Sequence, residues 1–412
     1  MKYLSKITFS ALCAASILAS ACAELNDPVQ FVDGKEVSVA YAAKVVNSEE
    51  DADRTSLLLF LADEAASQMS QGMSIPALDE VCESVGVKSV ERLFVSNSDM
   101  ARSRGMHRWY LVSFDDQVNP FEMAELFSSL SCVDKVQYNT VVSRDYGSEG
   151  TPYSYAPKAY GEFALPYNDP LLPDQWHYVN NLDISVAETS RSGADINVKN
   201  AWKLCAGDPM VIVAVCDEGV KYNHPDLIDN MWVNEDEIPA NGIDDDNNGY
   251  VDDIHGWNFL STSDYPKTIS WSEDGDKGHG THVAGTVAAV NHNGIGVGGV
   301  AGGSGKGDGG KIMSCQVFSG NSSATVAARA KAYEYAANNG ACILQCSFGL
   351  SGGMVTSDGA FDMSYGVERA GLDYFFNYRQ PYSPVDKNFA IFASGNDGYH
   401  LAGYPAAHSD YI

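Results

Sequence analysis

An aspartate and a histidine occupy places in this sequence where they could share a proton. Asp217 comes directly after the apolar run Val211–Val215, and a carboxylate there can orient a histidine. Taken alone, an aspartate before a glycine is also a common turn residue. His279 lies at the start of a predicted helix rich in small residues, which allow close packing on a sheet. His279 and His282 could form a zinc pair, but the sequence has no His-Glu-x-x-His helix.

Two further motifs carry groups that a peptide could meet. Ser347, Phe348 and Gly349 follow the apolar run Ala341–Cys346 and form a small polar edge, with which an extended peptide can pair. In Ala-Ser-Gly-Asn-Asp-Gly, the side-chain amide of Asn396 can donate to a developing oxyanion. All four motifs are expected beyond the carboxyl ends of strands, where parallel sheets carry their functional residues.

In this chain order the four motifs resemble those of the subtilisin-like serine proteases, over about 180 residues. The resemblance implies that Asp217 orients the base, that His279 is the general base and that Asn396 is the oxyanion donor. It also implies that Ser347–Gly349 belong to the strand that pairs with substrate backbone and walls the primary specificity pocket.

The sequence departs from the family pattern in two places. Glu218 stands where the family usually has Ser or Thr, and a second carboxylate that points inward would raise the pKa of one of the pair. The family places its nucleophile in a Gly-Thr-Ser-Met-Ala-x-Pro helix start, and no Gly-Thr-Ser occurs in residues 1–412. Ser364 has the wrong order and context. We therefore expect the printed chain to lack the nucleophile. A gene fragment, which we favour, an early stop and a true pseudoprotease are the three alternatives.

Eight carboxylates crowd the segment Glu235–Asp253, which contains no Lys or Arg. Carboxylates alternate there with amides before a turn glycine, as in calcium loops, although the glutamate that would close an EF-hand falls at His255. The alternative is a solvated acidic loop. The predicted calcium ligands are Asp244, Asp246, Asn248, Asp252 and Asp253.

A second calcium site is implied by the resemblance alone. Its ligands would be Asp169, Gln175, Asp226 and the loop near Asn293, and Asp226 in His-Pro-Asp-Leu matches the family best.

After residue 168, short apolar runs alternate with helical stretches. These runs and stretches predict the strands and helices that position the residues named above. Such a pattern predicts an α/β fold, here a subtilisin-like parallel sheet with helices on both faces in residues 168–412. The predicted strands are Met210–Val215, Lys311–Phe318, Ala341–Cys346 and Phe389–Ala393, and the stretch Ser323–Asn338 is predicted as a helix ending at Asn-Asn-Gly.

Residues 55–145 carry a different pattern, βαββαβ, which predicts an α+β ferredoxin-like domain. By resemblance it is a propeptide, an intramolecular chaperone and inhibitor, and the tyrosine-rich linker 146–167 is its processing region. The expected strands are Thr55–Leu61, Val87–Val95, Arg108–Phe114 and Val133–Val142; the expected helices are Ser74–Val85, capped by Ser74, and Pro120–Leu130, capped by Asn119.

The N-terminus predicts export. Lys2 and Lys6 precede the apolar run Ile7–Ala21, which is too short to span a bilayer and is typical of a secretory signal, residues 1–21. Leu-Ala-Ser-Ala-Cys resembles a bacterial lipobox, so we expect lipidation of Cys22; the alternative is plain secretion. Residues 22–54 are then expected to be a tether, and the alternative for the stretch up to about Asn47 is a first strand. The seven later cysteines have no metal or disulfide spacing, and several sit in apolar runs as small hydrophobes.

The composition of the chain excludes one class of function. The chain has 54 acidic and 26 basic residues and a net charge of −28, which excludes a nucleic-acid binder with a basic face. We expect an exported, calcium-stabilised serine endopeptidase zymogen with peptide or protein substrates. Its other partners would be its own propeptide domain and, through lipid alone, a membrane. The alternative is a non-catalytic, calcium-dependent peptide-binding or inhibitory lipoprotein.

Overall fold

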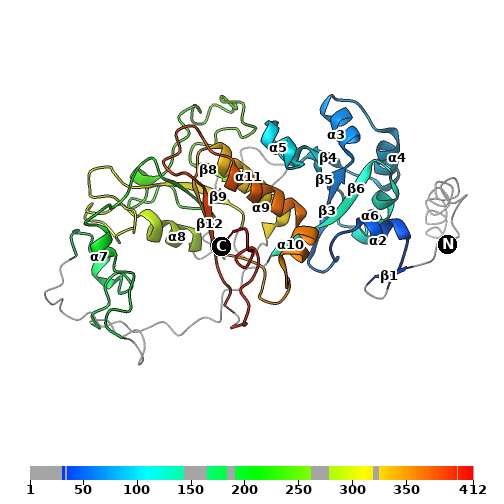
Figure 1. The fold of residues 1–412 in the computed structure, drawn as a ribbon. Helices are drawn as coiled ribbons and strands as arrows, with labels where there is room; N and C mark the ends of the chain where they lie inside the picture. The colour runs from blue at the N-terminus through cyan, green and yellow to red at the C-terminus, as the bar shows by residue number, and fades with distance from the viewer. Residues whose placement is uncertain are drawn as a thin grey trace, which may run out of the picture. The chain divides into compact units, whose positions relative to one another are not determined.

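The computed structural model describes residues 30–32, 35–142, 165–182, 191–260, 278–318, 324–396 and 398–411 (Figure 1). The signal, Cys22 and most of the linker lie outside them. Two compact units are present, the first within Met1–Leu93 and His107–Thr140, the second within Phe94–Met106 and Val141–Ile412. No helix in the described ranges combines the length and apolar character needed to cross a membrane.

The first unit has an antiparallel sheet in the order β6-β3-β5-β4. Its strands and main helices are β3 (Ala52–Leu61), α4 (Pro76–Val85), β4 (Ser89–Arg92), β5 (Trp109–Ser113), α6 (Pro120–Ser129) and β6 (Val133–Val142). Both helices pack on one apolar core with the sheet. This agrees with the predicted βαββαβ order, and the propeptide role stays a prediction.

Of the two predicted helix caps, one is confirmed and one is wrong. Asn119 caps α6 as predicted, since its side chain accepts a hydrogen bond from the N–H of Phe121 at 3.0 Å. The predicted Ser74 cap of α4 is wrong: the cap residue is Ile75, and the helix starts at Pro76. Proline is favoured at the first helical position because the N–H that it lacks would have no hydrogen-bond partner there. The short helices α3 (Asp63–Ser70) and α5 (Asp99–Ser103) were not predicted.

The predicted tether, 22–54, contains regular structure from residue 30 onward, so a tether is wrong for that part. β1 (Gln30–Val32) and β2 (Lys35–Val37) form a hairpin, and α2 (Val39–Lys44) follows. The Tyr41 hydroxyl lies 3.0 Å from that of Tyr138, and Lys44 donates to the carbonyl of Leu130. These contacts bury Tyr41 and make α2 part of the first unit.

The second unit is built on a parallel sheet in the order β12-β11-β7-β9-β8. Its strands are β7 (Ile212–Asp217), β8 (Gly256–Asn258), β9 (Lys311–Gln316), β11 (Ile343–Cys346) and β12 (Phe389–Phe392), and its helices α7 (Val198–Ala201), α8 (His279–Ala288), α9 (Val326–Asn338), α10 (Asp358–Ser364) and α11 (Gly366–Asn377). Four strands and α9 were predicted; β8 was not, because three residues carry little pattern. A two-residue strand, β10 (Ala324–Thr325), pairs with Val141 and Val142.

Helices lie on both faces of this sheet, as predicted (Figure 1). Ala284 and Ala288 of α8 pack against Val213 and Val215 of β7. Side chains alternate along a strand, so Cys216 faces the other way, where Tyr333 of α9 lies close to it. The sheet therefore separates the environment of α8 from that of α9.

Two domain boundaries differ from prediction. Segment 94–106, placed by the sequence in the first domain, clusters with the second unit. The N–H groups of Val95 and Ser96 donate to the carboxylate of Glu334 at 3.1 and 2.7 Å. The folded part of the second unit also begins before Asn168, because Tyr167 packs on Trp202, with ring centroids 4.8 Å apart.

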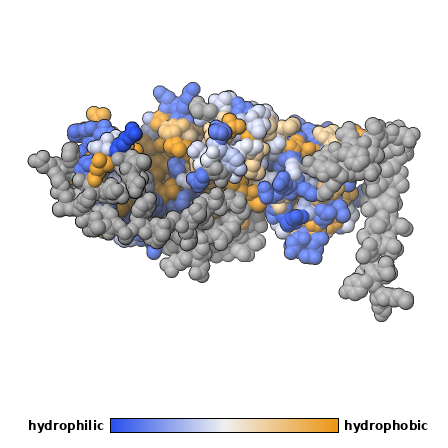
Figure 2. Space-filling view, turned by 90° about the horizontal axis from the view of Figure 1, so that it is seen from below, coloured by the Kyte–Doolittle hydropathy of each residue, from blue (hydrophilic) through white to orange (hydrophobic). Residues whose placement is uncertain are grey.

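The surface is mixed in character. Hydrophilic and hydrophobic residues are interspersed over the face in Figure 2, and the exposed apolar side chains include Leu204 and Met210 near α7.

Candidate active site

Asp217 and His279 meet in the structure. Nδ1 of His279 lies 2.9 Å from Oδ1 and 3.0 Å from Oδ2 of Asp217, although the residues are 62 positions apart. The Asp217 side chain is 3% exposed and that of His279 36%. A buried carboxylate on Nδ1 selects the tautomer that leaves Nε2 as the basic nitrogen, which is the arrangement of a general base with its orienting acid.

Each member of the pair is held by its own element. Asp217 is the last residue of β7, and its carbonyl accepts hydrogen bonds from the N–H groups of Val317 and Phe318, at 2.8 and 3.1 Å. His279 is the first residue of α8, after Gly278 in the left-handed conformation. The end of a central strand and the start of a helix thus bring the two side chains together.

Two hydroxyl groups that the sequence reasoning missed fasten the loop after Asp217. Ser314 of β9 is fully buried, and its Oγ accepts from the N–H of Val220 at 3.1 Å. Thr281 of α8 accepts from the N–H of Lys221 at 3.0 Å. Glu218, the residue that departs from the family pattern, is also fully buried, and its N–H donates to Oδ1 of Asp217.

The other two motifs lie at the same edge of the sheet. Ser347–Gly349 follow β11 and Asn396 follows β12, next to each other because these parallel strands are paired. The ring of Phe348 points into the core, where it packs on Phe318 and Phe392 with centroids 5.3 and 6.2 Å away. The side chain of Phe348 is therefore part of the core, and its backbone remains as the part that can pair with a peptide.

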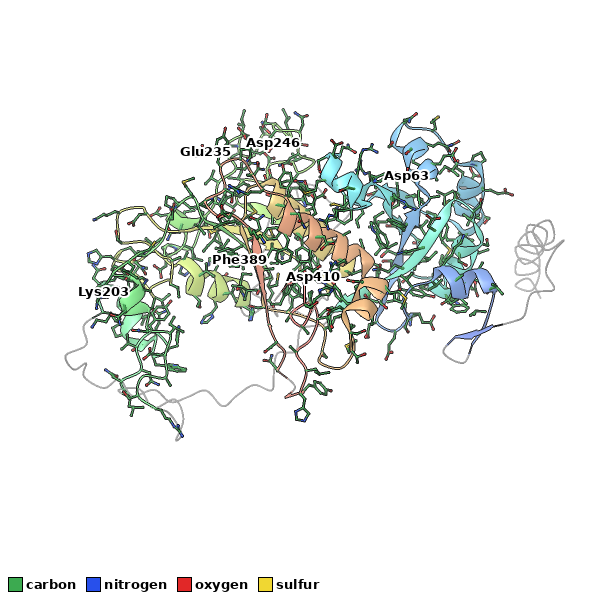
Figure 3. All side chains as sticks on the ribbon, viewed as in Figure 1. Asp63, Lys203, Glu235, Asp246, Phe389 and Asp410 are labelled. Carbon is green, nitrogen blue, oxygen red and sulfur yellow. The ribbon has the colours of Figure 1, made fainter. Side chains whose placement is uncertain are left out.

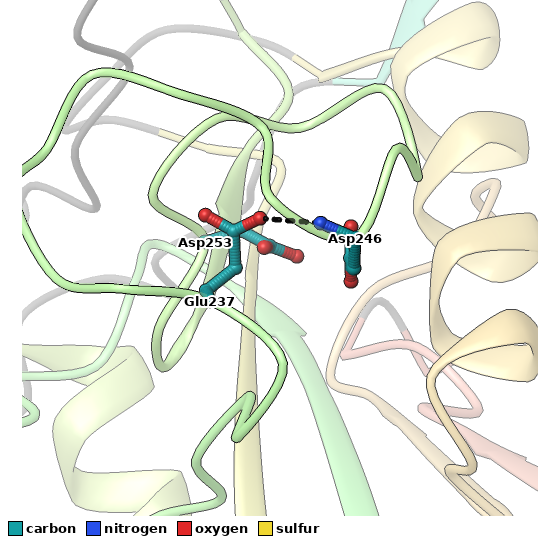
Figure 4. Close-up of side chains that lie close together, drawn as sticks. All are labelled: Glu237, Asp246 and Asp253. Carbon is teal, nitrogen blue, oxygen red and sulfur yellow. Dashed lines mark hydrogen bonds between the residues drawn. The ribbon is translucent and has the colours of Figure 1, made fainter.

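The acidic loop gathers three carboxylates, those of Glu237, Asp246 and Asp253, with one oxygen of each within 4.8 Å of the others (Figure 4). Figure 3 shows Asp246 and Glu235 in this region. Burial raises the pKa of Asp253 to about 6, against hydrogen bonds from Tyr335, Asn234 and Asn248. An all-oxygen, anionic donor set fits calcium.

The members of this cluster differ in part from the predicted ligands. Asp246 and Asp253 were predicted and Glu237 was not, because it stands nine residues before Asp246. Asp244 instead accepts from the N–H groups of Asn248 and Gly249, at 3.0 and 2.9 Å. Asp252 accepts in the same way from the N–H groups of residues 241 and 242. Asn248 donates from its side-chain amide to Asp246 and Asp253.

The residues of the second expected calcium site also converge, on loop 291–298. Asp169 accepts from the N–H groups of His292 and Asn293, at 2.8 and 3.1 Å. Asp226 accepts from the side-chain amide of Asn293 at 2.8 Å, and Gln175 exchanges two hydrogen bonds with Gly298. Burial raises the pKa of Asp226, and the hydrogen bonds from Asn293 and from the N–H of Val297 oppose that rise.

Comparison with known proteins finds similar sequences and folds. The family model described as "Subtilase family" matches residues 208–412. Subtilisin-like protease 1 of Plasmodium vivax is 38% identical over 33% of this chain and 19% of its own length. Thermitase of Thermoactinomyces vulgaris is 28% identical over 53% of this chain and 58% of its own length. Fervidolysin of Fervidobacterium pennivorans, a solved structure, has a TM-score of 0.49 and 17% identity over 88% of this chain and 43% of that one.

The chain spans less than a fifth of the length of the first curated relatives that it matches. The matched segment contains Asp217, His279, the strand end at Ser347 and Asn396 in the expected order. Residues 208–412 therefore form a subtilase-family domain.

Proposed function

We propose that this chain carries the base, the orienting acid and an oxyanion donor of a serine endopeptidase. The observation that carries the proposal is the contact of His279 Nδ1 with the buried carboxylate of Asp217. In that role Nε2 takes the proton of an attacking serine hydroxyl and later gives it to the leaving amine. Asp217 stabilises the imidazolium formed in between, and Asn396 donates to the oxyanion.

The substrate class in this proposal is an extended peptide. The backbone at Ser347–Gly349 continues past the end of β11, beside the end of β12, and would pair with such a peptide. The sequence relatives named as proteases support peptide-bond hydrolysis. Main-chain pairing of this kind gives affinity with little dependence on sequence, so side-chain preference would come from other parts of the site.

Calcium is proposed as a structural ion. Glu237, Asp246 and Asp253 would hold it in the acidic loop, and Asp169, Asp226 and the loop at Asn293 would hold a second ion. When bound, the ion neutralises carboxylates that otherwise repel one another, and it takes no part in proton transfer. Asp253 also accepts from the Tyr335 hydroxyl at 2.6 Å, so an ion there would tie the loop to α9.

We also propose synthesis as an exported zymogen anchored by lipid at Cys22. The compact βαββαβ unit ahead of the subtilase segment supports a propeptide role.

The test starts from the coding DNA after codon 412. An in-frame Gly-Thr-Ser-Met-Ala motif should give a protein that cleaves a chromogenic peptide. In that protein His279→Ala should abolish cleavage, and Asn396→Ala should lower turnover by about 100–1,000-fold, because the amide supplies one oxyanion donor among others. Full activity of His279→Ala would remove the assignment of the pair.

The printed chain itself gives a second test. Because no residue within 1–412 matches the family's nucleophile motif, a fluorophosphonate should leave all its serines unlabelled. A stoichiometric adduct on any serine would contradict this expectation. The non-catalytic alternative predicts instead a stop at codon 413 and calcium-dependent binding of an extended peptide without hydrolysis.

A further inference from the structure

Three cysteines form a row across the middle of the parallel sheet. Cys216 of β7 is the register partner of Cys315 on β9 and of Cys346 on β11. All three are fully buried. They stand 99 and 31 residues apart along the chain, a spacing that indicates no metal site, and only the strand register brings them together.

The geometry of the row suits a pair of thiolates on one ion. Neighbouring strands lie about 4.8 Å apart, and register partners in a parallel sheet point to the same face. Through this register the side chain of Cys216 lies between those of Cys315 and Cys346 on one face of the sheet. Two metal–sulfur bonds of about 2.3 Å on opposite sides of an ion span about 4.6 Å, which matches the strand spacing.

We propose that Cys216, with Cys315 or Cys346 as second ligand, is a two-coordinate site for a soft divalent cation with a filled d shell. Two S–H bonds lose their protons to solvent and two metal–sulfur bonds form, with no change of oxidation state. The product carries no net charge. Neutrality matters because a fully buried site penalises a net charge heavily.

The surroundings of the row are also appropriate for a soft ion. The tyrosines of α9, Tyr333 and Tyr335, lie near it, on the opposite face of the sheet from α8 and His279. Thiolates select soft cations, whereas the carboxylates of Glu237, Asp246 and Asp253 select hard ones, so the two sites would not compete. Because the two thiols must lose their protons for the ion to bind, binding should release protons and strengthen as pH rises.

Cys216 is the shared member of both pairs, and this makes the proposal specific. Cys315 and Cys346 are two strands apart, about 9.6 Å, too far for one ion to bridge. Removing either one leaves a complete pair with Cys216. Cys342 supplies a matched control, because it is equally buried on the chain entering β11, and its Sγ lies 3.7 Å from the carbonyl of Ile212 rather than in the row.

The test uses mercuric ion on the full chain, in a background in which Cys13, Cys22, Cys82, Cys132 and Cys205 are alanine. After slow loading and desalting, this reference should retain one ion per chain and hide two of its four thiols from titration in denaturant. Cys342→Ala should also retain one ion and hide two of its three thiols. Cys315→Ala and Cys346→Ala should each still retain one ion.

Cys216→Ala should retain none, and so should the Cys315→Ala/Cys346→Ala double variant, which keeps Cys216 in place. Cooperative thermal unfolding of each metal-free variant shows that the sheet is intact. The proposal is overturned if the reference retains no ion, if Cys216→Ala retains as much as the reference, or if Cys342→Ala loses the ion.

Discussion

Gly280 approaches Gly219 so closely that a β-carbon on Gly280 would lie 2.4 Å from the carbonyl oxygen of Gly219. The same β-carbon would lie 3.2 Å from Cβ of Asp217. The first turn of α8 therefore rests directly on the loop after β7. Any side chain at position 280 must push α8, and His279 with it, away from Asp217.

We predict that Gly280→Ala destabilises the second unit by about 1–3 kcal/mol, as overpacking does, and disturbs the contact of His279 with Asp217. Gly285 is the control within the same helix, since a β-carbon there meets no atom within 4 Å. Gly285→Ala should leave stability unchanged or raise it by up to about 1 kcal/mol, because alanine favours a helix. Urea unfolding measures both; equal effects would argue against the close approach.

Calcium should raise the melting temperature through the acidic loop, because an ion that binds only the folded state stabilises it. The gain should largely vanish in Asp246→Asn/Asp253→Asn, whose oxygens lie in the carboxylate cluster. Asp244→Asn should have a smaller effect, since Asp244 is engaged with backbone N–H groups. Glu235→Gln removes a charge from the same loop outside the cluster and controls for repulsion. A melting temperature unmoved by a chelator would mean a solvated loop.

Substitution of Glu368 is expected to lower the free energy of unfolding of the second unit more than most single substitutions do. It forms a buried two-bond pair with Arg329, at 2.9 and 2.8 Å, which joins α9 to α11. Glu368→Gln leaves a buried guanidinium without its counterion, which should cost about 3–5 kcal/mol. Asp386→Asn, which breaks an exposed pair with Arg379, should cost under about 1 kcal/mol in the same denaturant titration. Comparable losses would contradict the burial of the pair.

Low pH should reduce the stability of the second unit, in part because of His177. Burial, and then the nearby His282, lowers the pKa of His177 below its ordinary value of 6.5. The unfolded chain therefore binds a proton at His177 before the folded chain does, so stability falls as pH drops below about 6.5. His177→Gln should reduce the loss of unfolding free energy between pH 7.5 and 5.5. His400→Gln, at an exposed position, should leave the slope unchanged; an identical slope in both variants would refute the assignment.

Local patterns in the sequence determined the main elements and the order of the candidate site. Apolar runs predicted four strands of the parallel sheet, and Asn119 with Pro120 predicted the start of α6, because these signals act within a few residues. Asp217 and His279 could be named from their motifs for the same reason. The Ser74 cap failed because the proline two residues later decided where the helix starts.

Only the tertiary structure decided which distant residues meet. Glu237 joins Asp246 and Asp253 through the folding of one loop, segment 94–106 turns to Glu334, and Cys216 faces Cys315 and Cys346. Strand register and loop closure depend on packing between segments far apart in the chain, and a shift of one residue would turn every side chain of a strand to the other face. The chemistry of each group follows from its residue type, whereas its neighbours in space come from distant parts of the chain.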